Sequence, residues 1–100
     1  MISGSYKIEW RPLAREDLKA IVRFIGQDSP ARARTFGQQL KARIDSLAIS
    51  PKKGRSSELA DIPELRELVA HPNYIALYRV FDDLRTVQIL RIKHTARQWP

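Results

Sequence analysis

The sequence of 100 residues contains no cysteine, which excludes disulfide bonds, thiolate metal sites and cysteine nucleophiles. Its two histidines, His71 and His94, are too few for a histidine-based zinc site unless several carboxylates join them. Uninterrupted apolar runs are short, well below the roughly 20 residues that a membrane-spanning helix needs. Residues 1–5 are short and polar and show no apolar segment of a secretory signal. We therefore expect a small protein of a reducing compartment, without membrane contact.

What the sequence has in excess is positive charge. It carries 18 Lys and Arg against 11 Asp and Glu, a net charge of +7. Its hydrophobic content of 43% is enough for a core, and the length predicts one domain, residues 1–100. Residues 31–55 hold seven cations and only one acidic residue, Asp45. Such clustering favours a polyanion or an acidic protein as partner, and a solvated helix face is the alternative.

Two amphipathic helices are predicted in the first half of the chain. Pro12 can begin the first, and Pro30, preceded by the capping residue Ser29, can begin the second. Apolar residues recur at helical spacing in both segments. These residues are Leu18, Ile21, Val22 and Ile25 in the first helix, and Ala33, Phe36, Leu40, Ile44 and Leu47 in the second. Pro51 ends the second helix, and the segment Lys52–Arg55 follows as a basic loop.

Period-2 alternation predicts strands before and after the helices. Residues 6–10 form the first strand, and residues 65–70, 74–81 and 86–93 form three strands joined by short turns. In the last strand we expect one face to carry Val87, Ile89, Arg91 and Lys93, and the other Gln88, Leu90, Ile92 and His94. The order β-α-α-β-β-β predicts an α+β fold. An N-terminal helical hairpin packs on one face of an antiparallel sheet of about four strands, and the other face stays partly open.

Six short motifs run along the chain in an order and spacing that is more specific than any of them alone. They are Ile8-Glu9-Trp10-x-Pro12, Ser29-Pro30-Ala31-x-Ala33, Ser50-Pro51-Lys52-Lys53-Gly54-Arg55, Arg66-Glu67-Leu68-Val69, Tyr78-Arg79-Val80 and His94-x-Ala96-Arg97-x-Trp99-Pro100. Together they resemble the RelE/ParE superfamily of bacterial type II toxin–antitoxin toxins, and the ending is most similar to the ParE side. The resemblance implies a RelE/ParE-like fold and a cytoplasmic toxin, with roles such as plasmid stabilisation or stress response.

The resemblance to ParE implies a protein that inhibits DNA gyrase by protein contact and carries no hydrolytic site. Such a protein needs a basic, aromatic-bearing surface, and Arg and Trp are over-represented in binding hot spots. We expect the target-binding residues to be Lys52, Lys53, Arg55, Arg91, Arg97 and Trp99. No cofactor or metal is expected in this interpretation.

The alternative is a RelE-like, ribosome-dependent mRNA interferase, in which the 2′-hydroxyl of the RNA attacks the adjacent phosphate without a metal. Arg66 and Arg79 would then clamp the phosphate, and His94 would act as the acid because imidazole changes charge near neutral pH. The C-terminal tyrosine of the RelE branch has no evident counterpart, so Glu67 would have to act as the base. Arg66 and Arg79 could instead form structural ion pairs across the sheet. Whether the chain is an enzyme therefore depends on the branch.

In both toxin hypotheses the main partner is a cognate antitoxin, in a toxin–antitoxin hetero-oligomer. Its C-terminal segment would be disordered alone and fold on binding. The net charge of +7 favours a segment with acidic residues and apolar anchors, docked in the groove beside the helical hairpin and the sheet. A third hypothesis, a non-catalytic nucleic-acid-binding module, rests on charge alone.

Overall fold

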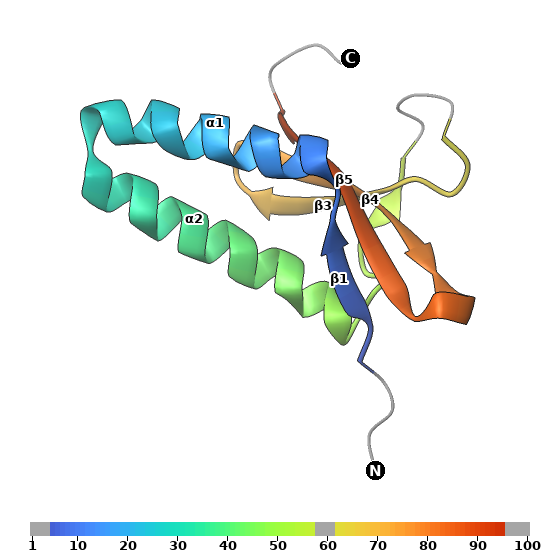
Figure 1. Cartoon of the computed structure of the whole chain (residues 1–100). Coiled ribbons are helices and arrows are strands. Elements are labelled where there is room, and N and C mark those ends of the chain that lie inside the picture. The colour runs from blue at the N-terminus through green and yellow to red at the C-terminus, as the bar shows by residue number, and fades with distance from the viewer. Residues whose placement is uncertain (1–4, 58–61, 96–100) are drawn as a thin grey trace.

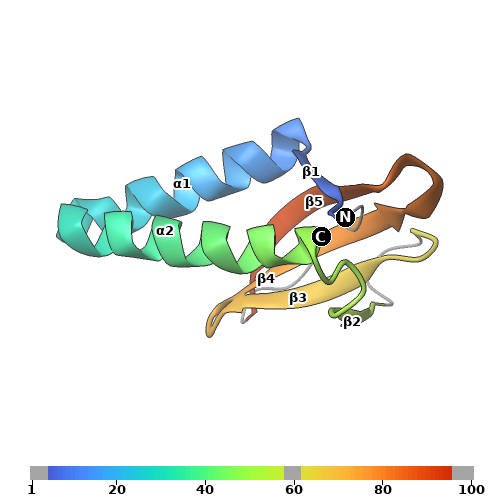
Figure 2. The ribbon, with the colours of Figure 1, turned by 90° about the horizontal axis from the view of Figure 1, so that it is seen from below.

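The computed structural model describes residues 5–57 and 62–95 (Figure 1). The helices are α1 (Pro12–Asp28) and α2 (Pro30–Asp45), and two short 3-10 helices are η1 (Ser46–Ala48) and η2 (Asp82–Leu84). The strands are β1 (Lys7–Trp10), β2 (Arg55–Ser56), β3 (Arg66–His71), β4 (Tyr74–Phe81) and β5 (Thr86–His94). Figure 2 shows the two helices side by side on one side of the sheet. No helix in these ranges has the length and apolar character needed to cross a membrane.

The hairpin of α1 and α2 forms as its sequence predicts. Ser29 is the only residue between the two helices, and it serves both of them. Its backbone N–H donates to Ile25 O at 3.1 Å, and its side-chain oxygen accepts the backbone N–H of Arg32 at 3.2 Å. Pro30 occupies the first turn of α2, where its missing N–H costs nothing. The reversal between the helices is therefore fixed by local chemistry.

The predicted α+β architecture is confirmed, but the sheet is mixed and has five strands in the order β1-β5-β4-β3-β2. The three C-terminal strands form the expected antiparallel meander. β1 is parallel to β5, and β2 adds a strand of two residues beside β3. Side-chain alternation is the same in parallel and antiparallel strands, and two residues are too few for any periodic pattern. These features therefore lie beyond what the sequence pattern can indicate.

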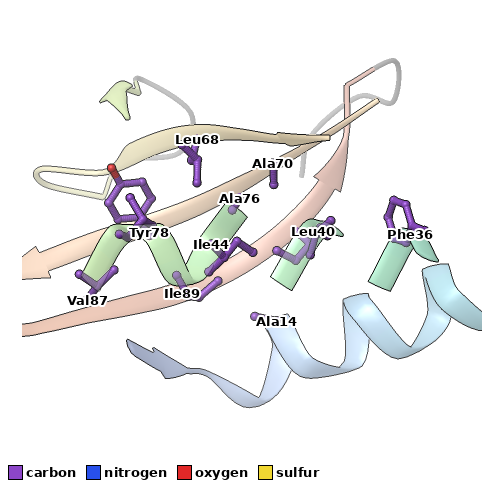
Figure 3. Close-up of a cluster of buried hydrophobic side chains, with 12 residues drawn as sticks. Ala14, Phe36, Leu40, Ile44, Leu68, Ala70, Ala76, Tyr78, Val87 and Ile89 are labelled. Carbon is purple, nitrogen blue, oxygen red and sulfur yellow. The ribbon is translucent and has the colours of Figure 1, made fainter. Parts of the chain in front are cut away.

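The core lies between α2 and the sheet (Figure 3). The apolar stripe predicted for α2 is buried there, including Phe36, Leu40 and Ile44. Facing it from the sheet are Leu68, Ala70, Ala76, Tyr78, Val87, Ile89 and Ile92. The stripe of α1 is only partly buried against the same cluster. A smaller cluster of Leu65, Ile75 and Leu77, with Ile62 and Leu90 against it, occupies the opposite face.

The predicted alternation of β5 holds as far as Leu90 and is wrong beyond it. Leu77 pairs with Arg91 whereas Tyr78 pairs with Ile89, so one extra residue, Leu90, is inserted in β5. Such a β-bulge reverses the faces of all following side chains. Ile92 consequently joins the core beneath the helices, and Leu90 packs on the opposite face.

Asp17 of α1 completes the edge of β5 where β1 ends. Its carboxylate accepts the backbone N–H of Ile92 at 2.9 Å and two bonds from the guanidinium of Arg91, at 2.7 and 3.0 Å. The hydrogen bond to Asp17 raises the pKa of Arg91, against the opposing effect of burial. The side chain of Asp17 is only 16% exposed. This contact therefore attaches α1 to the sheet.

Candidate functional site

A polar pocket of about 340 Å³ lies where β3 begins and β4 ends. The residues lining this polar pocket are Lys52, Ser56, Glu64, Arg66, Val80 and Asp82. The basic loop, Lys52–Arg55, contributes Lys52, and the turn after β4 contributes Asp82. Two of the residues that the sequence singles out, Lys52 and Arg66, therefore meet in one place.

Lys52 is bound to Asp82 in this pocket, and Tyr6 bonds the same carboxylate. Lys52 Nζ lies 2.8 Å from Asp82 Oδ2, and the Tyr6 hydroxyl donates to Asp82 Oδ1 at 2.7 Å. The guanidinium of Arg85 lies over the Tyr6 ring, 4.8 Å from its centroid. The bonds from Lys52 and then Tyr6 lower the pKa of Asp82, and the bond to Asp82 raises the pKa of Lys52. The network joins the residue before β1 and the basic loop to η2, which follows β4.

Replacing Asp82 by asparagine should make the free energy of unfolding depend less on pH in the acidic range. The pKa of Asp82 is lower in the folded chain, so its ionised form stabilises the fold above about pH 4 and this stabilisation is lost at lower pH. The raised pKa of Lys52 acts oppositely, because its contribution is present at neutral pH and is lost above about pH 10. Urea midpoints measured between about pH 2 and pH 7 test this for D82N. D83N is the matched control, and identical profiles for D82N and the wild type would contradict the prediction.

Arg66 holds the basic loop in place. Its Nη1 donates to Gly54 O at 2.7 Å and to Lys52 O at 3.2 Å. The backbone N–H of Gly54 donates to the hydroxyl of Tyr78 at 2.9 Å, and Tyr78 is fully buried. Burial raises the pKa of Tyr78, although the bond from Gly54 opposes this. Arg66 Nη1 thus holds two carbonyls of the basic loop.

Arg79 projects from the other face of the sheet. Tyr78 pairs with Arg66 and lies in the core beneath the helices, so the next residue of β4 points away from them. The guanidinium of Arg79 stacks on Phe81, 5.0 Å from the ring centroid. Its Nε is buried and has no hydrogen-bond partner within residues 5–57 and 62–95. The two arginines expected to clamp one phosphate therefore lie on opposite faces.

Glu67 shares the face of Arg79, because it pairs with Leu77 in the neighbouring strand. Its carboxylate is 3.1 Å from Arg55 Nη2 and accepts the hydroxyl of Ser57 at 2.6 Å. The candidate base is thus part of an ion pair. Within the described residues neither Arg66 nor Arg79 forms the alternative structural ion pair across the sheet, since Glu67 binds Arg55 and Asp82 binds Lys52.

His94 lies at the far end of the β4–β5 hairpin. It pairs with Tyr74, and the two rings are 4.9 Å apart in an edge-to-face arrangement. Tyr74 is five residues from Arg79 along β4, about 17 Å at the usual strand rise. The structure therefore does not bring Arg66, Arg79 and His94 together. In the described part of the chain, no group of three His, Cys, Asp or Glu could hold a metal ion.

The expected target-binding residues fall into three groups. Lys53 and Arg55 are exposed on the basic loop, and the side chain of Arg55 is 82% exposed even in its pair with Glu67. Lys52 and Arg91 are engaged in the ion pairs with Asp82 and Asp17. Arg97 and Trp99 lie outside the described residues.

Sequence reasoning did not single out Tyr6, Asp17 or Asp82 as parts of these networks. The sequence pattern predicts Tyr6 as a strand residue, Asp17 as an acidic residue near a helix start, and Asp82 as a turn residue. Each meets its partner only through the tertiary fold, since Tyr6 and Asp82 are 76 positions apart and Asp17 and Arg91 are 74 positions apart. No local pattern in the sequence carries that information.

Comparisons with known proteins place the chain among toxins. The family described as "ParE toxin of type II toxin-antitoxin system, parDE" matches residues 8–99. Toxin RelE2 of Caulobacter vibrioides is 47% identical over 88 residues, covering 88% of this chain and 91% of that protein. The putative toxin Y4kP of Sinorhizobium fredii is 32% identical over 94 residues, covering 94% and 93%.

Solved structures show the same fold. A chain of the chromosomal ParDE toxin–antitoxin system from P. aeruginosa superposes with a TM-score of 0.74 at 24% identity, covering 92% of this chain and 98% of that chain. A chain of the toxin–antitoxin complex RelBE2 from Mycobacterium tuberculosis gives a TM-score of 0.63 at 23% identity, covering 96% and 98%. Both ParE-like and RelE-like proteins thus share this architecture.

Proposed function

Because the chain belongs to the family of ParE toxins of type II toxin–antitoxin systems, we propose that it inhibits DNA gyrase by protein contact. In this proposal the toxin acts in the cytoplasm, hydrolyses no substrate and needs no cofactor. A cognate antitoxin neutralises it in a hetero-oligomer. The fold alone does not select this mechanism, because related toxins with different targets share one scaffold.

The separation of the three candidate catalytic side chains is the observation that carries the proposal. Cleavage of RNA needs an acid, a base and a phosphate clamp within hydrogen-bond reach of one reacting group. Arg66 and Arg79 lie on opposite faces of the sheet, and His94 lies at its other end. Arg66 Nη1 donates to the loop carbonyls of Lys52 and Gly54. The arrangement suits a rigid binding surface better than a reaction centre.

The basic loop is the surface that we propose for the target. Arg66 fixes its backbone, while Lys53 is exposed and forms no ion pair with residues 5–57 or 62–95. A cation that is held on a fixed loop and not yet paired is suited to an acidic protein surface. Arg97 and Trp99 remain predicted contacts of the same target.

The antitoxin is the second partner in the proposal. The chain has a net charge of +7, which favours an acidic partner. Two of the similar structures are toxin–antitoxin systems, the ParDE system from P. aeruginosa and the RelBE2 complex from M. tuberculosis. These observations support a partner encoded beside this toxin.

Purified toxin is expected to inhibit supercoiling of relaxed plasmid by gyrase. Lys53→Glu should raise the concentration for half-inhibition about tenfold, the equivalent of roughly 1.4 kcal/mol, because it reverses a charge on the contact surface. Lys19→Glu is the matched control, since Lys19 is an exposed lysine of α1, and it should leave inhibition within about twofold. Inhibition that is absent in the wild type, or equal in both variants, would overturn the proposed contact.

A second candidate function is ribosome-dependent cleavage of mRNA. It is favoured by the 47% identity to a protein named Toxin RelE2 and by the meeting of Lys52 and Arg66 in the polar pocket. Rates of DNA synthesis and protein synthesis just after induction separate the two functions. A gyrase inhibitor stops DNA synthesis first, whereas an mRNA interferase stops protein synthesis first and leaves cut codons in the ribosomal A site.

A further inference from the structure

Helix α1 carries an exposed apolar stripe beside its buried one. Leu13 is 59% exposed and Phe24 is 63% exposed, and the smaller Ala20 between them is also exposed. In an α-helix, a residue seven or eleven positions further along points within about 20° of the same direction. Leu13, Ala20 and Phe24 therefore form one line, about 16 Å long at the usual helical rise.

The exposed stripe points away from α2. A Cβ on Gly37 of α2 would lie 3.7 Å from Val22 Cγ2, so Val22 is on the side of α1 that contacts α2. Val22 comes nine positions after Leu13, which turns it by about 180° in an α-helix. Figure 2 shows α1 at the outer side of the helical layer. In the described part of the chain, the stripe therefore faces solvent beyond the edge of the hairpin.

The charge on α1 is balanced, unlike the charge of the chain as a whole. The helix contains three cations and three acidic residues, which are Arg15, Lys19, Arg23, Glu16, Asp17 and Asp28. By contrast, α2 has four cations against one acidic residue, Asp45, and the whole chain carries +7. Two copies can therefore meet through α1 without bringing their excess positive charge together.

The balanced charge of α1 distinguishes three classes of occupant. A nucleic acid needs a track of several cations for its phosphates, and the cations of α1 alternate with acidic residues. An acidic protein segment gains no net attraction from a helix without net charge. A second copy of this chain brings an equal apolar stripe and the same balanced charge. The second copy therefore fits this face of α1 best.

Antiparallel pairing of two α1 helices brings opposite charges together. With Leu13 of one copy beside Phe24 of the other, the two-fold axis passes midway between these positions. Glu16 then lies within about 3 Å, along the helix axis, of the level of Arg23 of the other copy. Both side chains are exposed, and neither forms an ion pair within residues 5–57 and 62–95. Parallel pairing would instead place Glu16 against Glu16.

We propose that two copies of this chain associate through the exposed stripe of α1, in antiparallel orientation. Leu13 of each copy packs on Phe24 of the other, and Glu16 pairs with Arg23 at both ends of the contact. The small side chain of Ala20 lets the two helices approach closely near the axis. One helix per copy makes a small interface, so the dissociation constant of the dimer lies in the micromolar range. The contact includes no residue of the basic loop and does not depend on the proposed target.

Sedimentation velocity of the purified toxin over a range of concentrations tests the association. Leu13→Asp and Phe24→Asp should each raise the dissociation constant of the dimer about tenfold or more, because each puts a charge into the apolar contact. Leu84→Asp is the matched control, since Leu84 is 68% exposed and belongs to η2. It changes the net charge equally and should leave the dissociation constant within about twofold.

Charge reversal tests the orientation of the two helices. Glu16→Arg and Arg23→Glu should each raise the dissociation constant about threefold, because each places like charges together at both ends of the contact. The double variant Glu16→Arg, Arg23→Glu should restore the wild-type value, because the reversed pair attracts again. A merely structural effect of either substitution would not be rescued by the other.

Each other outcome would contradict part of the proposal. A wild-type toxin that stays monomeric throughout would overturn it. Equal weakening by Leu84→Asp and Leu13→Asp would show a general effect of charge and overturn the contact through α1. Single charge variants that weaken association without rescue in the double variant would overturn the antiparallel orientation. If Leu13→Asp and Phe24→Asp abolished binding to the product of the adjacent reading frame, or to a DNA duplex, and left self-association unchanged, the stripe would belong to that occupant.

Discussion

Gly54→Ala is expected to lower the free energy of unfolding by about 3 kcal/mol, the usual cost of forcing a group into a packed interior. A Cβ on residue 54 would lie 2.5 Å from Glu67 O and 2.5 Å from the Tyr78 hydroxyl. The first atom belongs to the backbone of β3, and the second to a fully buried ring. Neither can move away cheaply, so the loop itself must shift. Urea denaturation monitored by circular dichroism measures the change.

Gly37→Ala is the matched control for this prediction. A Cβ at position 37 would meet the nearest atom, Val22 Cγ2, at 3.7 Å, which is an ordinary contact. Gly37 lies within α2, where alanine is favoured over glycine by up to about 1 kcal/mol. The change from glycine to alanine should therefore stabilise the protein at position 37 and destabilise it at position 54. A Gly54→Ala protein as stable as the wild type would mean that the loop is not packed this closely.

Asp17→Ala is expected to cost about 3 kcal/mol of unfolding free energy, in the range for breaking a well-buried ion pair. The change removes both bonds to Arg91 and the acceptor of the Ile92 N–H. It leaves a cation that is only 33% exposed and an unpaired backbone donor at the edge of β5. Loss of these contacts should also loosen α1 from the sheet.

Asp45→Ala is the control, because Asp45 forms an exposed pair with Lys41 four residues away. It should cost no more than about 0.5 kcal/mol. The double variant Asp17→Ala, Arg91→Ala should cost less than the sum of the two single variants, since it also removes the guanidinium that loses its two bonds to Asp17. Strict additivity in this cycle would show that the pair itself contributes little.

The elements of this fold that are governed by local chemistry follow directly from the sequence. Ser29 and Pro30 mark the hairpin turn because a cap and a first-turn proline act on adjacent backbone groups. The stripe from Ala33 to Leu47 predicts which face of α2 is buried, because helical periodicity depends only on spacing. Both are borne out in the structure.

Features that depend on register do not follow from the sequence. The extra residue Leu90 looks like any other apolar residue of an alternating strand, yet it decides which face Ile92 occupies. The same holds for the candidate site. Lys52 and Arg66 can be chosen as candidates from the sequence because they are charged. Only the pairing of Arg66 with Tyr78 shows that Arg79 lies on the opposite face of the sheet from Arg66.

The two bonds from Arg66 to the carbonyls of Lys52 and Gly54 have a consequence for the proposed contact between the basic loop and a target. The loop loses its conformational entropy when the protein folds. Binding a partner therefore requires no further loss of loop entropy. Complex formation is then opposed mainly by the loss of overall tumbling and by dehydration. A short cationic segment can in this way contribute to tight association without a large contact area.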